Sequence, residues 1–272
     1  MIAFPNAKIN LGLHILSRRT DGYHNLETVF YPVNIKDAVE IVENYDAAAP
    51  QVLWSASGID VPGNIDSNLC LKAFHLIKKD FPHLPPSKLH LHKNIPMGAG
   101  LGGGSANGAF TLKVINEKFN LKIQEKKLQE YALQLGSDCP FFINNKPAIA
   151  RGRGEILSTL PLNLYKYKIL LVNPGITIST AWAFNHITII DEKQEPVENL
   201  IQQPVTEWKN RLVNDFEKAV FSAYPQIKEI KEKLYHQGAL YASMSGSGSS
   251  VYGIFEKEVQ LNFPETYFIK WV

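Results

Sequence analysis

Residues 96–105 read Pro-Met-Gly-Ala-Gly-Leu-Gly-Gly-Gly-Ser and hold five of the eighteen glycines in the chain. Glycine leaves the backbone N–H group open to close approach, so a run of this density suits a loop that touches a ligand with its main chain. The pattern after the run predicts a helix from about Ser105 to Phe119. Free N–H groups followed by the positive end of a helix form the geometry of a phosphate site. The stretch therefore predicts a phosphate-binding loop.

Other kinds of loop fit the same glycines less well. A Walker A loop is excluded because the chain contains no Gly-Lys pair. The dinucleotide fingerprint is formally met by Gly98, Gly100 and Gly103. That fingerprint needs a strand running directly into the loop and an acidic residue about 20 positions later, whereas Pro96 intervenes and Glu117 lies inside the predicted helix. A dinucleotide site and a merely flexible loop are the weaker alternatives.

Outward from the loop, hydrophobic periodicity alternates between strand and helix patterns. Strands are predicted at 7–15 (half-buried), 28–33, 38–42, 87–92, 141–143, 169–172, 240–244 and 251–255, the last two as a hairpin around 245–249. Helices are predicted after the cap candidates 66–68, at 105–119, at 125–135 and from residue 225. Runs of strands with helices between them indicate an α+β fold. The Gly/Arg-rich stretch 151–154 is the expected boundary between a lobe of residues 1–150 and a lobe of residues 151–272.

The composition excludes several classes of protein. With 272 residues, 45% of them hydrophobic, the chain can bury a core, and a formal net charge of +2 is too small for a protein that coats nucleic acid. Cys70 and Cys139 lie in apolar segments without a neighbouring cysteine, so neither a disulfide framework nor a cysteine-based zinc site is expected. No apolar run approaches the roughly 18 residues that a spanning helix needs. We expect a soluble cytoplasmic protein that binds neither nucleic acid nor membrane.

Five segments of the chain resemble one known family. The loop 96–109, PMGAGLGGGSANGA, resembles the non-Walker ATP loop of the GHMP kinases, which include galactokinase and the homoserine and mevalonate kinases. Four further segments resemble one branch of that family, in the right order: AKINLGLHILSRRTDGYHNLETVF at 7–30, LGSDCPFFI at 135–143, ARGRGEIL at 150–157 and SMSGSGSSVYGIF at 243–255. Ala106 and Gly108 depart from the loop of that branch, but both residues are small, so the loop shape should survive.

The resemblance implies a two-lobed α+β fold with a mixed or antiparallel sheet and helices in each lobe. It implies that the chain transfers the γ-phosphoryl group of ATP, with Mg²⁺, to the 2-hydroxyl of a cytidine diphosphate-linked methylerythritol in non-mevalonate isoprenoid synthesis. Residues 1–150 would carry the ATP loop, and residues 151–272 would contribute to the substrate site. Another GHMP small-molecule kinase and a catalytically silent nucleotide-binding regulator are the alternatives. A monomer or weak homodimer is expected.

Two charged residues carry the expected chemistry. From its spacing alone, Asp138 before Pro140 is better explained as a helix cap or turn former, but by resemblance it matches the catalytic aspartate of the family. Lys8 and Asn10 share one face of the first strand, and their other explanation is a solvated strand face. By resemblance both contact the reacting hydroxyl and the phosphate, which implies that Lys8 lowers the pKa of Asp138 or of the hydroxyl.

The resemblance also implies a pocket for cytosine. Tyr23 would stack on the base and His24 would hydrogen-bond its edge, although by pattern alone the two residues only begin a strand. Counting ten residues from Pro174 places the second aromatic wall at Phe184, with Thr180 on the same stretch. Three residues of the last motif would back onto the phosphates and the substrate: Gly246, Ser247 and Gly248.

The remaining site residues are expected around ATP. By resemblance, the nucleotide contacts are Asn68, Lys93, Pro96, Gly98, Gly100, Leu101, Gly102, Gly103, Gly104, Ser105 and Asn107. Ser105 is also the candidate Mg²⁺ ligand, because a metal that bridges the β- and γ-phosphates accompanies ATP in most kinases. No carboxylate can be named for the metal. His90 and His92 alternate along one strand, which is typical of a surface and not of a metal pair.

Overall fold

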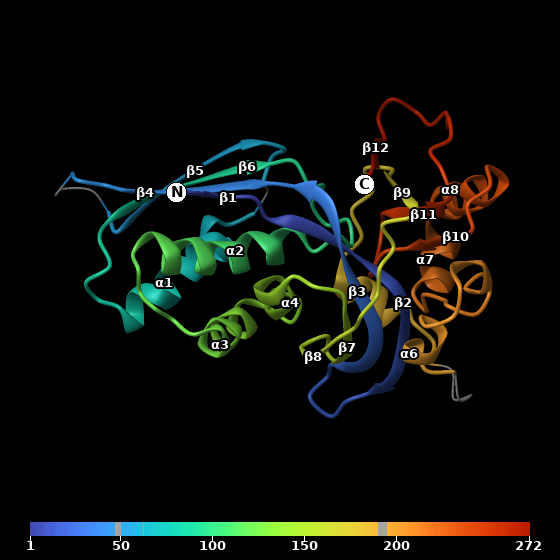
Figure 1. Ribbon diagram of the computed structural model, residues 1–272, viewed down its shortest axis with the longest axis horizontal. Coiled ribbons are helices and arrows are strands. Elements are labelled where there is room, and N and C mark those ends of the chain that lie inside the picture. The colour runs from blue at the N-terminus through green and yellow to red at the C-terminus, as the bar shows by residue number, and fades with distance from the viewer. Residues whose placement is uncertain (47–49, 62, 190–194) are drawn as a thin grey trace. The chain divides into compact units, whose positions relative to one another are not determined.

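The computed structural model describes residues 1–46, 50–61, 63–189 and 195–272 (Figure 1). The chain divides into two compact units, each assembled from several segments. The first unit holds residues 1–7, 34–97 and 102–145, and the second holds residues 8–33, 98–101 and 146–272. The expected lobes, 1–150 and 151–272, differ from these units because residues 8–33 pack with the C-terminal half of the chain.

The first unit is a four-stranded sheet with helices on one face (Figure 1). The strand order is β1-β4-β6-β5, from β1 (Ile2–Ala3), β4 (Ala38–Glu43), β6 (Ser87–Lys93) and β5 (Val52–Gly58). β4 pairs with β6 antiparallel, and β5 pairs with β6 parallel, so the sheet is mixed. The helices are α1 (Leu69–Asp80), α2 (Gly103–Lys118), α3 (Glu125–Leu135) and α4 (Cys139–Asn144), with the short 3₁₀ turn η1 (Ile65–Ser67) before α1.

The second unit contains two four-stranded sheets. One has the order β2-β3-β7-β8, from β2 (Asn6–Arg18), β3 (His24–Lys36), β7 (Ala148–Gly152) and β8 (Ile156–Thr159). The other has the order β10-β11-β9-β12, from β10 (Tyr241–Met244), β11 (Val251–Phe255), β9 (Lys168–Asn173) and β12 (Phe268–Trp271). Its helical segments are α5 (Thr180–Asn185), α6 (Val197–Leu200), η2 (Val205–Glu207), α7 (Glu217–Ala223) and α8 (Pro225–His236).

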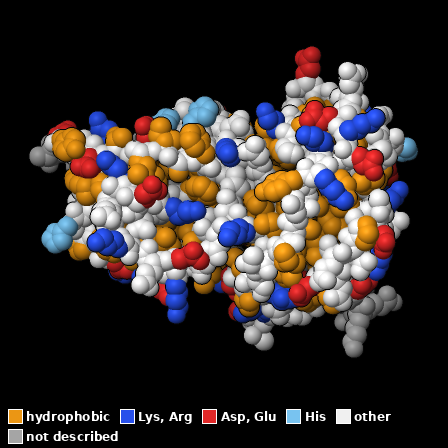
Figure 2. All heavy atoms as spheres, in the orientation of Figure 1, with side chains coloured by type: hydrophobic (Ala, Val, Ile, Leu, Met, Phe, Trp, Pro, Cys, Tyr) orange, Lys and Arg blue, Asp and Glu red, His pale blue; other side chains and the backbone are white. Residues whose placement is uncertain are grey.

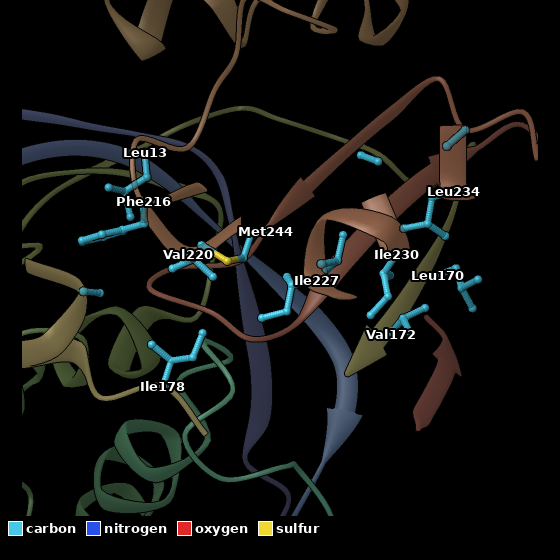
Figure 3. Packing of buried hydrophobic residues seen from close by; sticks show 14 of the residues in the cluster. Leu13, Leu170, Val172, Ile178, Phe216, Val220, Ile227, Ile230, Leu234 and Met244 are labelled. Carbon is cyan, nitrogen blue, oxygen red and sulfur yellow. The ribbon is translucent and has the colours of Figure 1, made fainter. Parts of the chain in front are cut away.

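The core of the second unit lies between the β9–β12 sheet and the helices α7 and α8 (Figure 3). α8 contributes Ile227, Ile230 and Leu234, which lie on one face of the helix predicted from residue 225. Leu170 and Val172 on β9 pack in the same cluster. The predicted hairpin is confirmed: β10 and β11 pair antiparallel in the register that faces Met244 with Val251 across the 245–249 turn.

Two predictions of local structure are wrong. The run 141–143 is not a strand but the middle of α4, because Pro140 stands in the first turn of the helix and Phe141 and Phe142 are both buried, with their rings edge to face at 5.0 Å between centroids. The first strand is not half-buried: from Asn6 to Ile15 every residue of β2 is buried, polar and apolar alike. Alternation along a strand predicts one solvated face only where nothing covers that face.

Charged side chains of both signs are interspersed on the face drawn in Figure 2, in keeping with the small net charge. Among the described residues, no helix combines the length and the apolar character needed to cross a membrane.

Candidate active site

The glycine loop connects β6 to α2. Gly98, Gly100 and Gly102 have φ values of +60°, +74° and +68°, in the left-handed region that favours glycine. Gly102 is the N-cap of α2, and no side chain caps the helix there. The first N–H groups of a helix have no acceptor within the helix, so α2 presents uncapped donors and the positive end of its dipole at the end of the loop. This arrangement fits an anion such as a phosphate.

The backbone carbonyl oxygens of the loop accept hydrogen bonds from other parts of the chain. The oxygen of Ala99 accepts from the Ser250 backbone N at 3.2 Å. The oxygen of Gly100 accepts from Ser245 Oγ at 2.8 Å, and the oxygen of Leu101 accepts from the Lys8 backbone N at 2.9 Å. Three successive carbonyl oxygens are thus engaged within the protein. The N–H groups are therefore the backbone groups of the loop that face a ligand.

The loop packs too closely to admit side chains at two of its glycines. A Cβ atom on Gly100 would lie 1.9 Å from the backbone oxygen of Ser245. A Cβ atom on Gly103 would lie 2.9 Å from Cγ2 of Ile95 and 3.0 Å from Nζ of Lys93. A Cβ atom on Gly104 would meet nothing within 4 Å, so this side of the first helical turn is open. The glycines therefore build a tight backbone cradle with one open side.

Lys8 and Asn10 are buried on β2, which excludes the alternative explanation of a solvated strand face. Lys8 Nζ donates to Asn10 Oδ1 at 2.5 Å and lies 4.8 Å from the ring centroid of Phe30. Asn10 Nδ2 donates to Thr28 Oγ1 at 3.0 Å. A buried ammonium group is tolerated only where hydrogen bonds or charges compensate for lost water, so Lys8 is a cation held in one fixed position.

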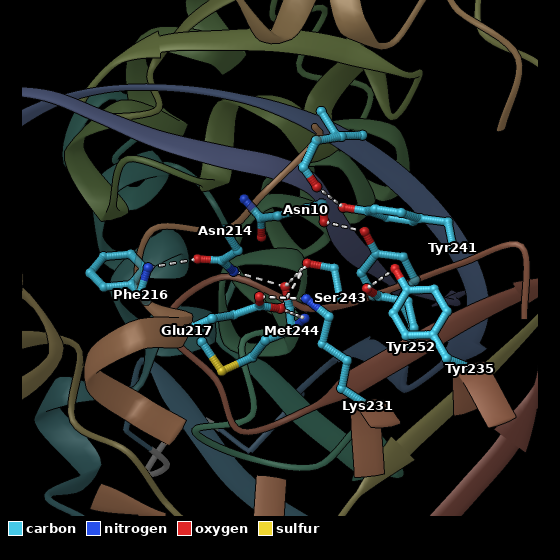
Figure 4. A network of polar contacts seen from close by, with 12 residues as sticks. Asn10, Asn214, Phe216, Glu217, Lys231, Tyr235, Tyr241, Ser243, Met244 and Tyr252 are labelled. Carbon is cyan, nitrogen blue, oxygen red and sulfur yellow. Dashed lines mark hydrogen bonds and ion pairs between the residues drawn. The ribbon is translucent and has the colours of Figure 1, made fainter. Parts of the chain in front are cut away.

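The 245–249 turn is held by residues that the sequence did not single out (Figure 4). Asn214 Nδ2 donates to the backbone oxygens of Met244 and Gly246, both at 2.8 Å. Glu217 accepts from the Met244 backbone N at 2.8 Å and from Lys231 Nζ at 2.6 Å. These partners lie 14 to 32 residues apart in the chain, and no local pattern marks them.

Asp138 stands immediately before α4 and is half-buried. Its backbone is already helical, with φ −82° and ψ −16°, and its side chain makes no cap hydrogen bond. The explanation of Asp138 as a side-chain helix cap is therefore wrong. Asp138 lies in the turn that precedes α4, so the alternative of a turn former stays open.

The residues expected around cytosine lie in the second unit. Tyr23 is 54% exposed, and the Arg153 guanidinium carbon lies 4.7 Å from its ring centroid. His24 stacks on Phe184 with 4.8 Å between ring centroids and 16° between planes. Burial, and secondarily the charge of Arg18, lowers the pKa of His24 below its ordinary value, which favours the neutral imidazole. A neutral imidazole offers one donor and one acceptor to a base edge.

Other predicted site residues in this region are placed as follows. Thr180 is the first residue of α5 and is exposed, and its Oγ1 lies 3.3 Å from Ser247 Oγ. Gly246 and Gly248 are buried in the 245–249 turn with φ values of +57° and +96°. The last motif therefore presents Ser247 toward the start of α5.

Three of the expected ATP contacts have their polar atoms engaged within the first unit. Lys93 Nζ donates to Asp37 Oδ2 at 2.6 Å, and Asn107 Nδ2 donates to the same oxygen at 2.8 Å. Asn68 caps α1 by accepting from the Cys70 backbone N at 2.9 Å. Burial lowers the pKa of Lys93, and the nearby Asp37 carboxylate opposes that shift. Their contact with ATP remains a prediction.

The metal prediction has little local support. No group of three or more His, Cys, Asp or Glu within the described ranges could hold a metal ion. The half-buried Ser105 shares a hydrogen bond with the Cys139 thiol, whose pKa burial raises to about 12. Ser105 lies in the first turn of α2, which also holds the backbone N–H groups that have no acceptor within the helix.

Comparison with known protein families gives two matches. The model of the GHMP kinases N terminal domain matches residues 68–146, and the model of the GHMP kinases C terminal domain matches residues 197–263. The first match covers the glycine loop and Asp138, and the second covers the 245–249 turn. A dinucleotide-binding enzyme, the weaker alternative for the loop, is thereby excluded.

Individual proteins match over nearly the whole chain. The 4-diphosphocytidyl-2-C-methyl-D-erythritol kinase of Bacteroides thetaiotaomicron is 53% identical over 266 residues, which cover 98% of this chain and 95% of that protein. The kinase of the same name from Azobacteroides pseudotrichonymphae is 52% identical and covers 94% of each chain. A crystal structure of 4-(cytidine 5'-diphospho)-2C-methyl-D-erythritol kinase superposes with a TM-score of 0.78 at 28% identity, over 93% of this chain and 90% of the other. Because it matches both GHMP kinase domains and shares about half of its residues with the two kinases from Bacteroides thetaiotaomicron and Azobacteroides pseudotrichonymphae, the chain belongs to the 4-diphosphocytidyl-2-C-methyl-D-erythritol kinase family of the GHMP kinases.

Proposed function

We propose that the chain transfers the γ-phosphoryl group of ATP to the 2-hydroxyl of 4-diphosphocytidyl-2-C-methyl-D-erythritol. The observation that carries this proposal is the identity of 53% with a kinase of that name over 98% of the chain. The N-terminus of α2, which follows the glycine loop and has no side-chain cap, supports the proposal. The phosphates of a nucleoside triphosphate need hydrogen-bond donors of this kind. The enzyme would act in the cytoplasm as a monomer or weak homodimer.

The nucleotide would lie against the glycine loop with its phosphates on the N–H groups at the start of α2. Mg²⁺ would arrive with ATP and neutralise charge on the phosphates, with Ser105 Oγ as the nearest protein candidate for a ligand. Phosphoryl transfer asks the protein mainly for position and charge stabilisation. The buried and hydrogen-bonded Lys8 supplies a fixed positive charge for this purpose.

Asp138 would accept or orient the proton of the attacking hydroxyl. General-base and proton-orienting groups are worth on the order of 10²–10⁴ in rate, and the half-buried Asp138 stands at the start of α4, in the segment 135–143 that resembles the catalytic-aspartate segment of the family. On the substrate side, Tyr23 and Phe184 would stack on cytosine, and neutral His24 would read its edge. Thr180 and Ser247 would line the approach to that pocket.

The experiment that tests the proposal is an assay of ADP release by the purified chain with Mg²⁺ and ATP across a panel of alcohols. We expect turnover with 4-diphosphocytidyl-2-C-methyl-D-erythritol and only background with homoserine and mevalonate. Turnover of homoserine or mevalonate instead would indicate another GHMP kinase. Binding of ATP without turnover of any alcohol, even in a single-turnover experiment, would favour the silent regulator.

A further inference from the structure

Asp37 occupies the single residue between β3 and β4, and its side chain is fully buried. Its Oδ1 accepts from the backbone N of Asn94 at 2.7 Å and of Ile95 at 2.8 Å. Its Oδ2 accepts from Lys93 Nζ at 2.6 Å and from Asn107 Nδ2 at 2.8 Å. An ionised carboxylate has about four acceptor sites, so this one is saturated by four donors of the protein.

The four donors lie on both sides of the glycine loop. Asn94 and Ile95 form the exit of β6 that leads into the loop. Asn107 lies in α2, one turn after the helix begins at Gly103. Lys93 Nζ lies next to the same helical turn, since a Cβ atom added to Gly103 would stand 3.0 Å from it. One carboxylate therefore joins the start of the loop to its end.

The position of Asp37 is itself fixed. Its backbone N donates to the Pro5 oxygen at 2.9 Å, so the residue is tied to the N-terminal segment of the same unit. The side chains of Asp37 and Lys93 are both 0% exposed. Because two buried charges are tolerated only in good geometry with their remaining bonds satisfied, the pair resists displacement of either partner.

We propose that Asp37 is the positioning residue of the ATP loop: it fixes the end of β6 against the first turns of α2 and so sets the spacing of the phosphate-binding N–H groups. The proposal rests on the proposed function, since it takes the loop as the ATP site. It assigns Lys93 and Asn107 to act on the nucleotide through Asp37 and Gly103, because Lys93 Nζ and Asn107 Nδ2 each donate to the same carboxylate oxygen.

The decisive variant is Asp37→Asn, which keeps the size of the side chain and removes its charge. An amide has one acceptor oxygen in place of two and turns an NH₂ group toward two of the four donors. The probe is the non-hydrolysable analogue AMP-PNP with Mg²⁺, titrated calorimetrically at a temperature well below the thermal transition of each protein. We expect its Kd to rise by on the order of 10- to 100-fold, since a shift of about 1 Å in a positioned group has effects of this size.

Two comparisons separate positioning from general destabilisation. The KM for the cytidylylated alcohol should change much less than the Kd for AMP-PNP, since the four donors to Asp37 are not among the residues proposed to bind the alcohol. The matched control is Tyr131→Phe, which removes a hydrogen bond of 2.5 Å between Tyr131 and Asp80 in the same unit but away from the loop. We expect this control to lower the Tm and to leave the Kd for AMP-PNP unchanged.

A double-mutant cycle tests whether Asn107 acts through Asp37. Asn107→Ala should weaken AMP-PNP binding in the parent and have little further effect in the Asp37→Asn background, because residues of one network are not additive. If Asp37→Asn leaves too little folded protein, the double variant Asp37→Asn/Lys93→Met removes the uncompensated lysine and supplies the measurement.

The proposal is overturned if a folded variant without the Asp37 carboxylate binds AMP-PNP with the parental Kd, or if the affinities for AMP-PNP and for the alcohol substrate fall equally. A parent protein that fails to bind AMP-PNP would instead overturn the proposed function. The two failures are therefore distinguishable.

Discussion

The imidazole of His24 lies flat on the ring of Phe184, with 4.8 Å between the centroids and 16° between the planes. A second neighbour, Phe216, meets Phe184 edge-on at 4.9 Å and 84°. Phe184 is the proposed wall of the cytosine pocket, and His24 is proposed to hydrogen-bond the edge of the base. His24 therefore already covers one face of the Phe184 ring. A base that stacks on Phe184 must use the opposite face or take the place of His24.

This contact sharpens a prediction for the base pocket. Tyr23→Ala and Phe184→Ala should each cost about 1–3 kcal/mol of binding to the cytidylylated alcohol, the usual worth of stacking a base on an aromatic ring. By the rule of 1.4 kcal/mol per decade this is roughly a 5- to 150-fold loss of affinity. His24→Ala should also narrow the preference for cytidine over uridine diphosphate analogues, because it removes edge recognition. The measurements are KM and calorimetric Kd for both analogues.

The matched control for this pocket is Trp182, which lies on α5 beside Phe184 and stacks on His186 at 4.3 Å. Trp182→Ala should leave substrate affinity unchanged. If Phe184→Ala leaves the KM unchanged while Trp182→Ala raises it, the second wall of the pocket is Trp182 and the assignment of Phe184 falls. The Kd for ATP should be unchanged in all these variants.

The elements that could be predicted from the sequence are those with strong local signals. α3 ends at Leu135, with Gly136 as its C-cap, and α8 begins at Pro225, as the apolar spacing and the end signals predict. The run Phe141 to Ile143 was too short to decide between strand and helix, because three apolar residues satisfy both periods. Here Pro140 in the first helical turn and burial of the two phenylalanines decide for helix.

The site could be predicted only where a motif carries it. The glycine loop is visible because its backbone requirement restricts residue type locally. The contacts of Asp37 are not visible, since they span 56 to 70 residues of chain and involve an aspartate that looks like any turn residue. Lys8 was expected on a solvated or cleft-facing strand, and its burial against Phe30 depends on packing that alternation along β2 does not report.

Asp138 carries the prediction about the rate of phosphoryl transfer. Asp138→Asn should lower kcat by on the order of 10²–10⁴ and leave the KM for ATP nearly unchanged. A residue that serves only as a helix cap or turn former would instead cost about 1 kcal/mol of stability and leave kcat near that of the parent. Steady-state kinetics and urea unfolding distinguish the two results. A kcat within about fivefold of the parent would contradict the catalytic assignment.

Gly103→Val should weaken ATP binding and spare the cytosine side. The reason is steric: a Cβ atom there would lie 2.9 Å from Ile95 Cγ2 and 3.0 Å from Lys93 Nζ, and Val adds two methyl groups to it. Positive φ plays no part at this glycine, in contrast to Gly98, Gly100 and Gly102. Calorimetric titration with each ligand separately is the measurement.

Gly104→Ala controls for the loss of a glycine in the same helical turn. Its Cβ atom would meet nothing within 4 Å, and Ala favours a helix over Gly by roughly 1 kcal/mol, so the free energy of unfolding should be unchanged or higher. Equal losses of ATP and alcohol affinity in Gly103→Val would mean that the substitution had unfolded the first unit, and the steric account of the loop would then lose its support.

The last prediction concerns the pH dependence of stability and rests on His14. This residue is buried on β2, and its Nε2 has no hydrogen-bond partner among the described residues. Burial lowers the pKa of His14 below its ordinary value of 6.5, and the carboxylates of Asp215 and Glu27 oppose the shift only in part. The unfolded chain therefore binds a proton at a higher pH than the folded chain does.

Between pH 6.5 and the lower folded pKa of His14, the free energy of unfolding should fall as the pH falls. His14→Gln should flatten this slope. Urea unfolding of this variant and of the parent from pH 7.5 to 5 is the measurement, and an unaltered slope in His14→Gln would show that other groups take up the protons on unfolding.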